Sequence, residues 1–204
     1  MIDGFNLYHS VIQASRDLGG ASTKWLNIHS LCSSYLPDFG KTAKIGSVHY
    51  FTALPFYLND GDKIRRQKDF NRCLESTGVD VKTAKFKSKD LFCKRCNQFT
   101  KTQEEKETDV AIAAKLFELL ITDSADIVAL VSGDTDLIPA ARTVDHLYSR
   151  DNIRFILPYG RSNDEIKQLF PNSIDVKKER YIAHQFPDPV QVSRRRAIDK
   201  PPSW

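Results

Sequence analysis

The apolar run IVALV at residues 127–131 constrains the fold of this chain most strongly. A short, continuous run rich in β-branched residues is typical of a strand that is buried on both faces of a parallel sheet. Similar strand-like runs occur at 45–53, 79–86 and 152–158, with Met1 and Ile2 as a short stub. Amphipathic segments alternate with them, at about 6–15, 25–35, 60–77, 105–122, 137–148 and 163–170. This alternation predicts an α/β fold with a parallel sheet flanked by helices.

The length of 204 residues favours one domain with one core, which we place at residues 1–175. The stretch 87–105 is polar and contains the motif CKRC, so we interpret it as an insertion loop before the next helix. Residues 176–204 are predicted to form a C-terminal extension. Because proline and charged residues are frequent beyond Phe186, we expect that part to be an extended tail.

The sequence shows neither the apolar run of roughly 20 residues that a membrane span needs nor the layout of a signal peptide. We therefore expect a cytoplasmic protein without a membrane segment. Four cysteines in a chain that is not otherwise disulfide-like are expected to be reduced thiols. The oligomeric state is left open.

A net charge of +4 permits a polyanionic partner without requiring one. Basic residues gather at 63–68, 82–89 and 193–196, either as solvated faces or as a surface that contacts phosphates, and we weigh these two interpretations equally. On the second interpretation, the substrate-binding cations would include Lys63, Arg65 and Arg66. The aromatic residues that could stack on unpaired bases are Tyr8, Phe56 and Tyr57.

The first acidic segment is MIDGFN, where Asp3 directly follows the strand stub and Asn6 stands near the start of the next helix. For each residue alone, the simpler interpretation is an Asx turn with Asn6 as the helix N-cap. A functional interpretation needs the other acidic segments.

The second segment, EEKETDVAIAAKLFELL, places Asp109 on the helix face that its apolar residues would bury. A structural role would be a favourable first-turn position near the helix dipole, with Thr108 as the cap. However, Thr102 and Glu105 match the S/T-x-x-E capping box, which would start the helix earlier and put Asp109 in its second turn. That pattern weakens the structural interpretation.

The third segment is LVSGDTDLIPAA. Proline is tolerated only in the first turn of a helix, so Pro139 predicts a helix that begins near Asp136. Asp134 then lies in the loop and Asp136 is the candidate cap. Gly133 would supply the turn that directs both acids into a cleft at the carboxyl edge of the sheet.

Taken together, these segments predict a metal site. The carboxyl ends of parallel strands meet at one edge of an α/β sheet, where ligands generally bind. Four carboxylates gathered there repel one another unless a cation neutralises them or some take up protons. Oxygen ligands favour Mg²⁺ or Mn²⁺, ions that activate water and polarise a phosphodiester. The chemistry we infer is phosphodiester hydrolysis.

The motifs IDGFNLY, EKETDVAIA and VSGDTDLIPAA, in this order and at these separations, resemble the NYN domain of the PIN-like nuclease superfamily. The resemblance implies a Rossmann-like sheet with an acidic metal pocket and, for many members, metal-dependent RNA cleavage. For this chain we expect an endoribonuclease that acts on RNA or single-stranded DNA. It assigns pocket roles by motif to Asp3, Asn6, Asp109, Asp134 and Asp136. Ser132 and Thr135 match small hydroxyl positions that support these residues or the substrate.

Two features depart from the family pattern. Only Met1 and Ile2 precede Asp3, where the family usually has several apolar residues, so either the central strand is short or the amino terminus is trimmed. The family also does not require the Cys93–x–x–Cys96 pair. This pair supplies half of a tetrahedral zinc site, which Cys32, Cys73, His184 or a second subunit could complete. A structural Zn²⁺ is favoured over a redox role, because the pair does not stand at a strand-to-helix junction.

Two other functions compete with the nuclease. The pocket could bind nucleic acid or a nucleotide without cleaving it, within a larger assembly, although an acidic cleft repels phosphate when no metal is present. A metal-dependent phosphatase ranks last, because DGFN follows the first strand where an aspartyl nucleophile motif would be needed.

Overall fold

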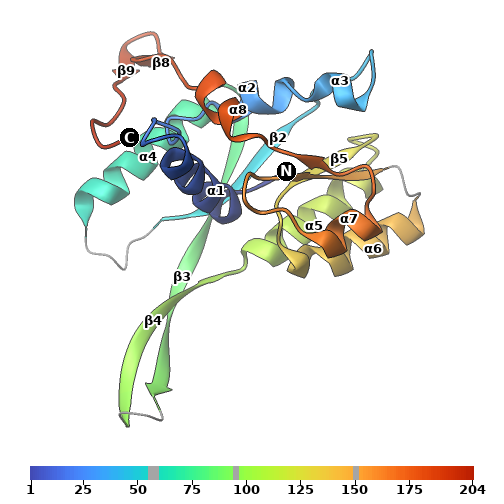
Figure 1. The fold of residues 1–204 in the computed structure, drawn as a ribbon, viewed down its shortest axis with the longest axis horizontal. Coiled ribbons are helices and arrows are strands. Elements are labelled where there is room, and N and C mark those ends of the chain that lie inside the picture. The colour runs from blue at the N-terminus through green and yellow to red at the C-terminus, as the bar shows by residue number, and fades with distance from the viewer. Residues whose placement is uncertain (55–59, 94–96, 149–151) are drawn as a thin grey trace.

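The computed structural model describes residues 1–54, 60–93, 97–148 and 152–204. Within them, seven strands form one sheet in the order β4-β3-β2-β1-β5-β6-β7 (Figure 1). All pairings are parallel except that of β3 with β4. The strands are β1 (Ile2–Asp3), β2 (Val48–Ala53), β3 (Val79–Cys93), β4 (Gln98–Lys106), β5 (Val128–Val131), β6 (Ile153–Leu157) and β7 (Ile174–Asp175). The predicted α/β fold with a parallel sheet is confirmed.

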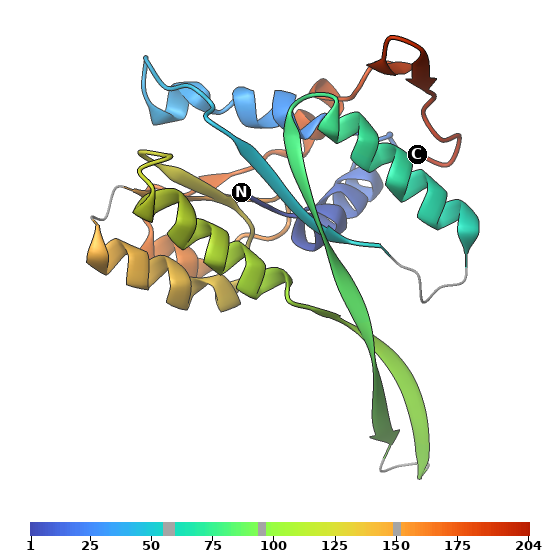
Figure 2. The same cartoon turned by 180° about the vertical axis from the view of Figure 1, so that it is seen from behind.

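Helices cover both faces of the sheet. One core packs α1, α2, α4 and α8 on the first face, and the other packs α5, α6 and α7 on the second (Figures 1 and 2). Their bounds are α1 (Gly4–Asp17), α2 (Ile28–Ser33), α3 (Leu36–Phe39), α4 (Gly61–Glu75), α5 (Thr108–Ile121), the 3₁₀ helix η2 (Thr135–Leu137), α6 (Ile138–Leu147), α7 (Asp164–Leu169) and α8 (Lys178–Ala183). In the described part of the chain, none of these helices is long and apolar enough to cross a membrane.

The central strand β1 is only two residues long, yet it pairs on both sides. Ile2 lies opposite Tyr50 of β2 and Val131 of β5, and Asp3 lies opposite Phe51. This register places Asp3, the last residue of β1, beside Ser132, the residue after β5. The carboxyl ends of the two strands therefore deliver Asp3 and Ser132 to the same point of the sheet edge.

The segment 87–105 was predicted to be a loop, but its described residues belong mostly to strands. β3 continues past the sheet and pairs with β4 in an antiparallel hairpin, from Lys85 opposite Lys106 to Cys93 opposite Gln98. We call the pair beyond Lys85 the hairpin arm, and it projects away from the body of the protein (Figure 2). The polar composition that suggested a loop belongs to a two-stranded ribbon, which pairs with no third strand among the residues that the structure describes.

The segment beyond Phe186 is not an extended tail. It forms a second, two-stranded sheet from β8 (Val190–Ser193) and β9 (Arg196–Ile198), and Val190 and Ile198 are buried in the first core. The ring of Trp204 lies 5.4 Å from that of Phe70 and 6.0 Å from that of Trp25. Aromatic burial thus outweighs the proline and charge content of this segment. The domain boundary after residue 175 stays a prediction.

Candidate active site

Asp3 stands at the junction of β1 and α1, and both of its carboxylate oxygens are hydrogen-bonded. The backbone N–H of Asn6 donates to Oδ1 at 2.9 Å, and the Ser132 hydroxyl donates to Oδ2 at 2.9 Å. Asp3 is the N-cap of α1, so the prediction that Asn6 is the cap is wrong. Gly4 is needed next, because a Cβ there would overlap the Phe51 carbonyl oxygen.

Asn6 instead links α1 to the loop after β5. Its Oδ1 accepts from the backbone N–H of Gly133 at 3.1 Å. A Cβ on Gly133 would overlap the Arg161 carbonyl oxygen, so only glycine fits between the loops that follow β5 and β6. Ser132 is fully buried, and its Oγ accepts from the Asp134 N–H at 3.1 Å. A continuous set of hydrogen bonds therefore joins the ends of β1 and β5.

The two aspartates after β5 exchange the roles that the sequence suggested. Asp134 is the N-cap of η2, and its Oδ1 accepts from the Asp136 N–H at 3.0 Å. The prediction that Asp136 is the cap is wrong. The cause is the short η2, which starts at Thr135 and precedes the helix whose first turn contains Pro139. Asp136 is exposed, and Asp134 is half-buried.

Asp109 lies in the first turn of α5. The predicted capping box is wrong, because Thr102 and Glu105 belong to β4 rather than to a helix. The N-cap is Glu107, with a left-handed φ of 80°, so Thr108 is not the cap either. A first-turn carboxylate is favourable near the helix dipole, and this structural role stands beside the functional one.

The four aspartates converge electrostatically. The pKa of Asp109 lies above its ordinary value because of partial desolvation, and then because of the negative charges of Asp134, Asp3 and Asp136, in that order. No group of three or more His, Cys, Asp or Glu side chains in the described part of the chain is arranged to hold a metal ion by itself. The carboxylates are therefore close enough to repel one another, although they do not form a complete set of metal ligands.

Thr135 starts η2, and its carbonyl oxygen accepts from the Ile138 N–H.

Sequence reasoning missed two residues next to this site. Arg161 lies in the turn after β6, with its carbonyl oxygen against Gly133. Its Nε is buried and has no hydrogen-bond partner among the described residues. Across from it, His9 of α1 has a pKa below the ordinary value, because of desolvation and then the Arg161 charge. The available signal was the position of Arg161 just beyond a predicted strand, where ligand-binding loops belong.

The predicted substrate-binding cations lie at the start of α4, which follows β2. Lys63 pairs with Asp60 at 3.4 Å, and Arg65 pairs with Asp62 at 3.0 Å, both at exposed positions. Arg66 has no ion pair among the described residues. Phe56 and Tyr57 lie outside the described residues, whereas Tyr8 is 49% exposed on α1. Their contact with substrate stays a prediction.

The zinc prediction also stays untested, because Cys96 and the side chain of Cys93 lie outside the described part. Two of the suggested additional ligands are engaged elsewhere. Cys73 is fully buried in the first core, where desolvation raises its pKa to about 11, and the His184 ring lies 2.9 Å from the Ser30 hydroxyl. Burial also raises the pKa of Cys32.

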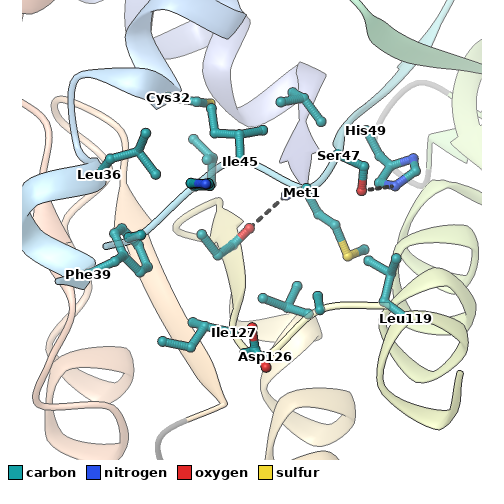
Figure 3. Close-up of a pocket in the computed structure, with 18 of the residues that line it drawn as sticks. Met1, Cys32, Leu36, Phe39, Ile45, Ser47, His49, Leu119, Asp126 and Ile127 are labelled. Atoms are coloured by element: carbon teal, nitrogen blue, oxygen red, sulfur yellow. Dashed lines mark hydrogen bonds between the residues drawn. The ribbon is translucent and has the colours of Figure 1, made fainter. Parts of the chain in front are cut away.

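The opposite, amino edge of the sheet holds a cavity of about 560 Å³ (Figure 3). It is lined by the starts of β2 and β5 and by the segment 42–47, with Cys32, Phe39 and Leu119 around it. The four aspartates do not line it. This cavity and the acidic cluster thus lie at different edges of the sheet.

One curated protein of similar sequence is the 6-hydroxy-3-succinoylpyridine 3-monooxygenase HspA of Pseudomonas putida (strain DSM 28022 / S16). It is 24% identical over 238 residues, which cover all of this chain and 73% of that protein. No solved structure matches the chain. The model of the NYN domain family matches residues 2–182, a span that contains all four aspartates and Asn6. NYN domains are generally nucleases, so the match supports a hydrolase that acts on nucleic acid. The chain therefore belongs to the NYN domain family of the PIN-like superfamily.

Proposed function

We propose that this protein is a divalent-metal-dependent endoribonuclease whose active site is formed by Asp3, Asp109, Asp134 and Asp136. The observation that carries the proposal is the hydrogen-bonded link from Asp3 through Ser132 to Asp134. It places a buried and a half-buried carboxylate at the edge where α/β folds bind ligands. Repulsion between carboxylates is a cost that folding alone does not require, and a bound cation would remove it.

The donors at this edge fit Mg²⁺ or Mn²⁺. They are carboxylate and amide oxygens, which these ions prefer. Magnesium keeps several waters and is usually held by one or two carboxylates together with substrate phosphates, so an open arrangement is compatible with it. Asp134 is the best candidate ligand, because only its Oδ1 serves as the cap. When bound, the ion would supply an acidified water and polarise the phosphodiester.

The remaining residues orient these groups. Ser132 donates to Asp3 and accepts from the Asp134 backbone, which fixes the position of one carboxylate relative to the other. Because Asn6 Oδ1 accepts from Gly133, its Nδ2 is left as a donor. This donor can hold a phosphate oxygen at the site. Asp109 contributes negative charge from the facing helix.

The test is Asp134→Asn, because asparagine caps helices as well as aspartate does. The substitution removes the charge and retains η2. We expect cleavage of labelled RNA in Mg²⁺ or Mn²⁺ to fall roughly 100-fold or more, with little change in the free energy of unfolding. Asp123→Asn is the matched control, since Asp123 lies after α5 with a left-handed φ of 48° that asparagine also adopts. Undiminished cleavage by Asp134→Asn would overturn the assignment.

The same assay decides between the nuclease and a binding module without catalysis. Single- and double-stranded RNA and DNA are incubated with wild type, with metal or with chelator. The proposal expects RNA products that chelator abolishes. RNA binding that chelator leaves unchanged, with no product from any of the four nucleic acids, would favour the binding module.

The monooxygenase-named relative supplies a second candidate, because its similarity extends over the whole chain. A monooxygenase consumes O₂ and a reductant, so oxygen uptake with 6-hydroxy-3-succinoylpyridine and reduced nicotinamide is the direct test. We expect none. Uptake that depends on that substrate would replace the nuclease proposal.

A further inference from the structure

The first turns of α1 expose a group of aromatic rings directly after Asp3. Phe5 is 55% and Tyr8 is 49% exposed, and both rings make edge-on contacts with His9, at 4.4 Å and 5.7 Å between centroids. We call Phe5, Tyr8 and His9 the α1 aromatic face. The opposite side of the helix, with Leu7 and Val11, packs in the core.

The α1 aromatic face follows Asp3 directly on α1, and its His9 is close to the cation Arg161. The pKa of His9 lies below its ordinary value because of desolvation and then because of the nearby Arg161 charge. Arg161 makes no ion pair with any residue that the structure describes, and its buried Nε lacks a hydrogen-bond partner there. A guanidinium that is close to His9, and whose backbone contacts Gly133 in the loop before Asp134, is available to a phosphate.

We propose that the α1 aromatic face and Arg161 bind single-stranded RNA, with one unpaired base stacked on Phe5 and Tyr8 and a neighbouring phosphate on Arg161. This inference rests on the proposed function, because the bound strand would then lead its next phosphate to Asp3 and Asp134. Bases within a duplex are stacked on one another and offer no free face. The surface therefore selects unpaired segments.

The sequence of the base matters little for such a site, because every base has a flat face that can stack. Loss of a stacking partner weakens binding by roughly 5- to 150-fold. Loss of a phosphate contact weakens binding and also lowers its dependence on salt by about one counterion. These two signatures separate the contribution of the rings from that of the guanidinium.

The experiment measures fluorescence anisotropy of a labelled adenosine dodecamer RNA in the Asp134→Asn background, where we expect no cleavage. The variants are Phe5→Leu, Tyr8→Leu and Arg161→Gln. Tyr148→Leu is the matched control, because Tyr148 is 43% exposed but lies at the far end of α6. We expect the first two to weaken binding at least about fivefold, Arg161→Gln to weaken it and reduce the salt slope, and the control to have no effect. Thermal unfolding should be unchanged for the leucine variants.

Two further probes make the result specific. An RNA of the same length without bases should bind wild type more weakly and should not respond to Phe5→Leu or Tyr8→Leu. A duplex should be equally insensitive to them. Unchanged affinity of the three variants for the single strand, or equal losses with the duplex and the RNA without bases, would overturn the inference. So would light scattering that shows a wild-type dimer split by these substitutions, with RNA affinity unchanged.

This inference and the proposed function fail separately. If Asp134→Asn still cleaves RNA, the assignment of the metal site is wrong, whatever the anisotropy shows. If Asp134→Asn abolishes cleavage and the leucine variants bind RNA like wild type, the nuclease proposal stands and the α1 aromatic face has no role in binding the strand.

Discussion

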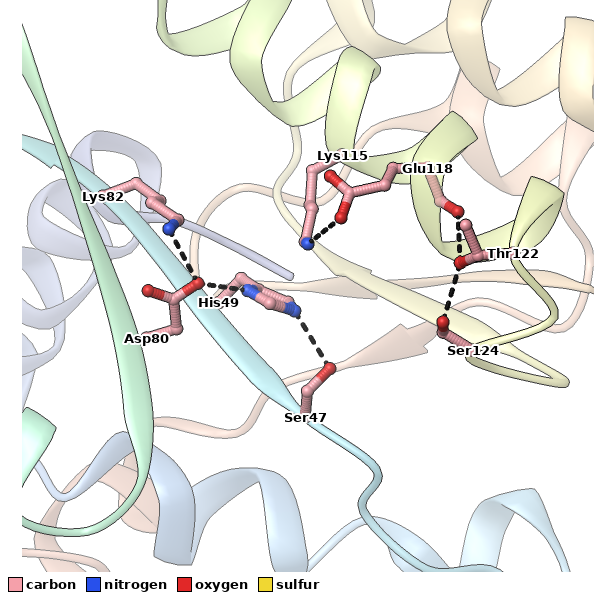
Figure 4. Close-up of polar contacts among 8 residues, drawn as sticks. All are labelled: Ser47, His49, Asp80, Lys82, Lys115, Glu118, Thr122 and Ser124. Carbon is pink, nitrogen blue, oxygen red and sulfur yellow. Dashed lines mark hydrogen bonds and ion pairs between the residues drawn. The ribbon is translucent and has the colours of Figure 1, made fainter.

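The two edges of the sheet differ in how their charged side chains are arranged. At the amino edge, the His49 ring lies between Asp80 and Ser47 at 2.9 Å from each, Lys82 lies 3.1 Å from Asp80, and Lys115 contacts Glu118 at 2.7 Å (Figure 4). Asp80 and Glu118 there each have a lysine as a partner of opposite sign. At the carboxyl edge, like charges gather around Asp109, and Arg161 remains outside their hydrogen bonds. Like charges gathered at one place are costly for stability, so they support the proposed metal site at the carboxyl edge.

The largest expected effect separates the edges by activity. Asp3→Asn removes a buried charge but retains a capping oxygen for the Asn6 N–H, so the protein should fold while RNA cleavage falls roughly 100-fold or more. Asp80→Asn at the amino edge should leave cleavage unchanged. Product formation under Mg²⁺ measures both. Equal losses for both variants would contradict the functional difference between the edges.

Substitution of Gly133 tests how closely the loops after β5 and β6 pack against each other. Gly133→Ala must displace the Arg161 backbone, so we expect the free energy of unfolding to fall by about 1–3 kcal/mol and cleavage to fall about 10-fold or more. Gly61→Ala, with nothing within 4 Å of the added Cβ, is the control and should be nearly neutral. Urea unfolding and initial cleavage rates provide the measurements. A stable, active Gly133→Ala would show that the loops are not tightly apposed.

Stability without metal should depend on pH through Asp109. Its raised pKa means that the native state binds this proton more tightly than the unfolded chain does. The stability that this proton contributes is fully present below the pKa of Asp109 in the unfolded chain. It is lost as the pH rises through the higher pKa of Asp109 in the native state. In chelator, Asp109→Asn should therefore unfold at higher urea than wild type at neutral pH, and the difference should vanish in acid. Added Mg²⁺ should stabilise wild type more than the variant.

The smallest effect belongs to the amino edge. The Lys115–Glu118 pair is largely exposed on the glutamate side, and exposed pairs contribute little. Glu118→Gln should change neither the urea midpoint nor RNA cleavage measurably. A loss of cleavage would mean that the paired edge also contributes to function.

The sequence predicted the parts of the fold that repeat a pattern. Buried runs such as IVALV predicted the strands. The rule that ligands bind at the carboxyl edge of a parallel sheet predicted that the acids after β1 and β5 lie at the same edge. It did not predict the hairpin arm or the packed C-terminus, because both depend on contacts with distant residues: Trp204 with Trp25 and Phe70, and β4 with β3. The capping box predicted at Thr102 did not form, because this residue belongs to β4, which pairs with β3.

Within the site, the acidic segments were visible in the sequence, but the assignment of caps was not. The predicted caps, Asn6 and Asp136, lie within one helical turn of the observed caps, Asp3 and Asp134. The start of a helix cannot be located from the sequence more closely than that. The sequence did not indicate a role for Arg161, because this residue is near Gly133 and His9 only in the folded structure and is far from His9 in the chain.

The double role of Asp3 and Asp134 has a genetic consequence. Both carboxylates cap helices, and asparagine fills that structural role as well as aspartate does. A single G-to-A base change converts an aspartate codon into an asparagine codon. On the proposed mechanism, a gene for this fold is one base substitution away from encoding a protein that folds, binds a strand and no longer cuts it.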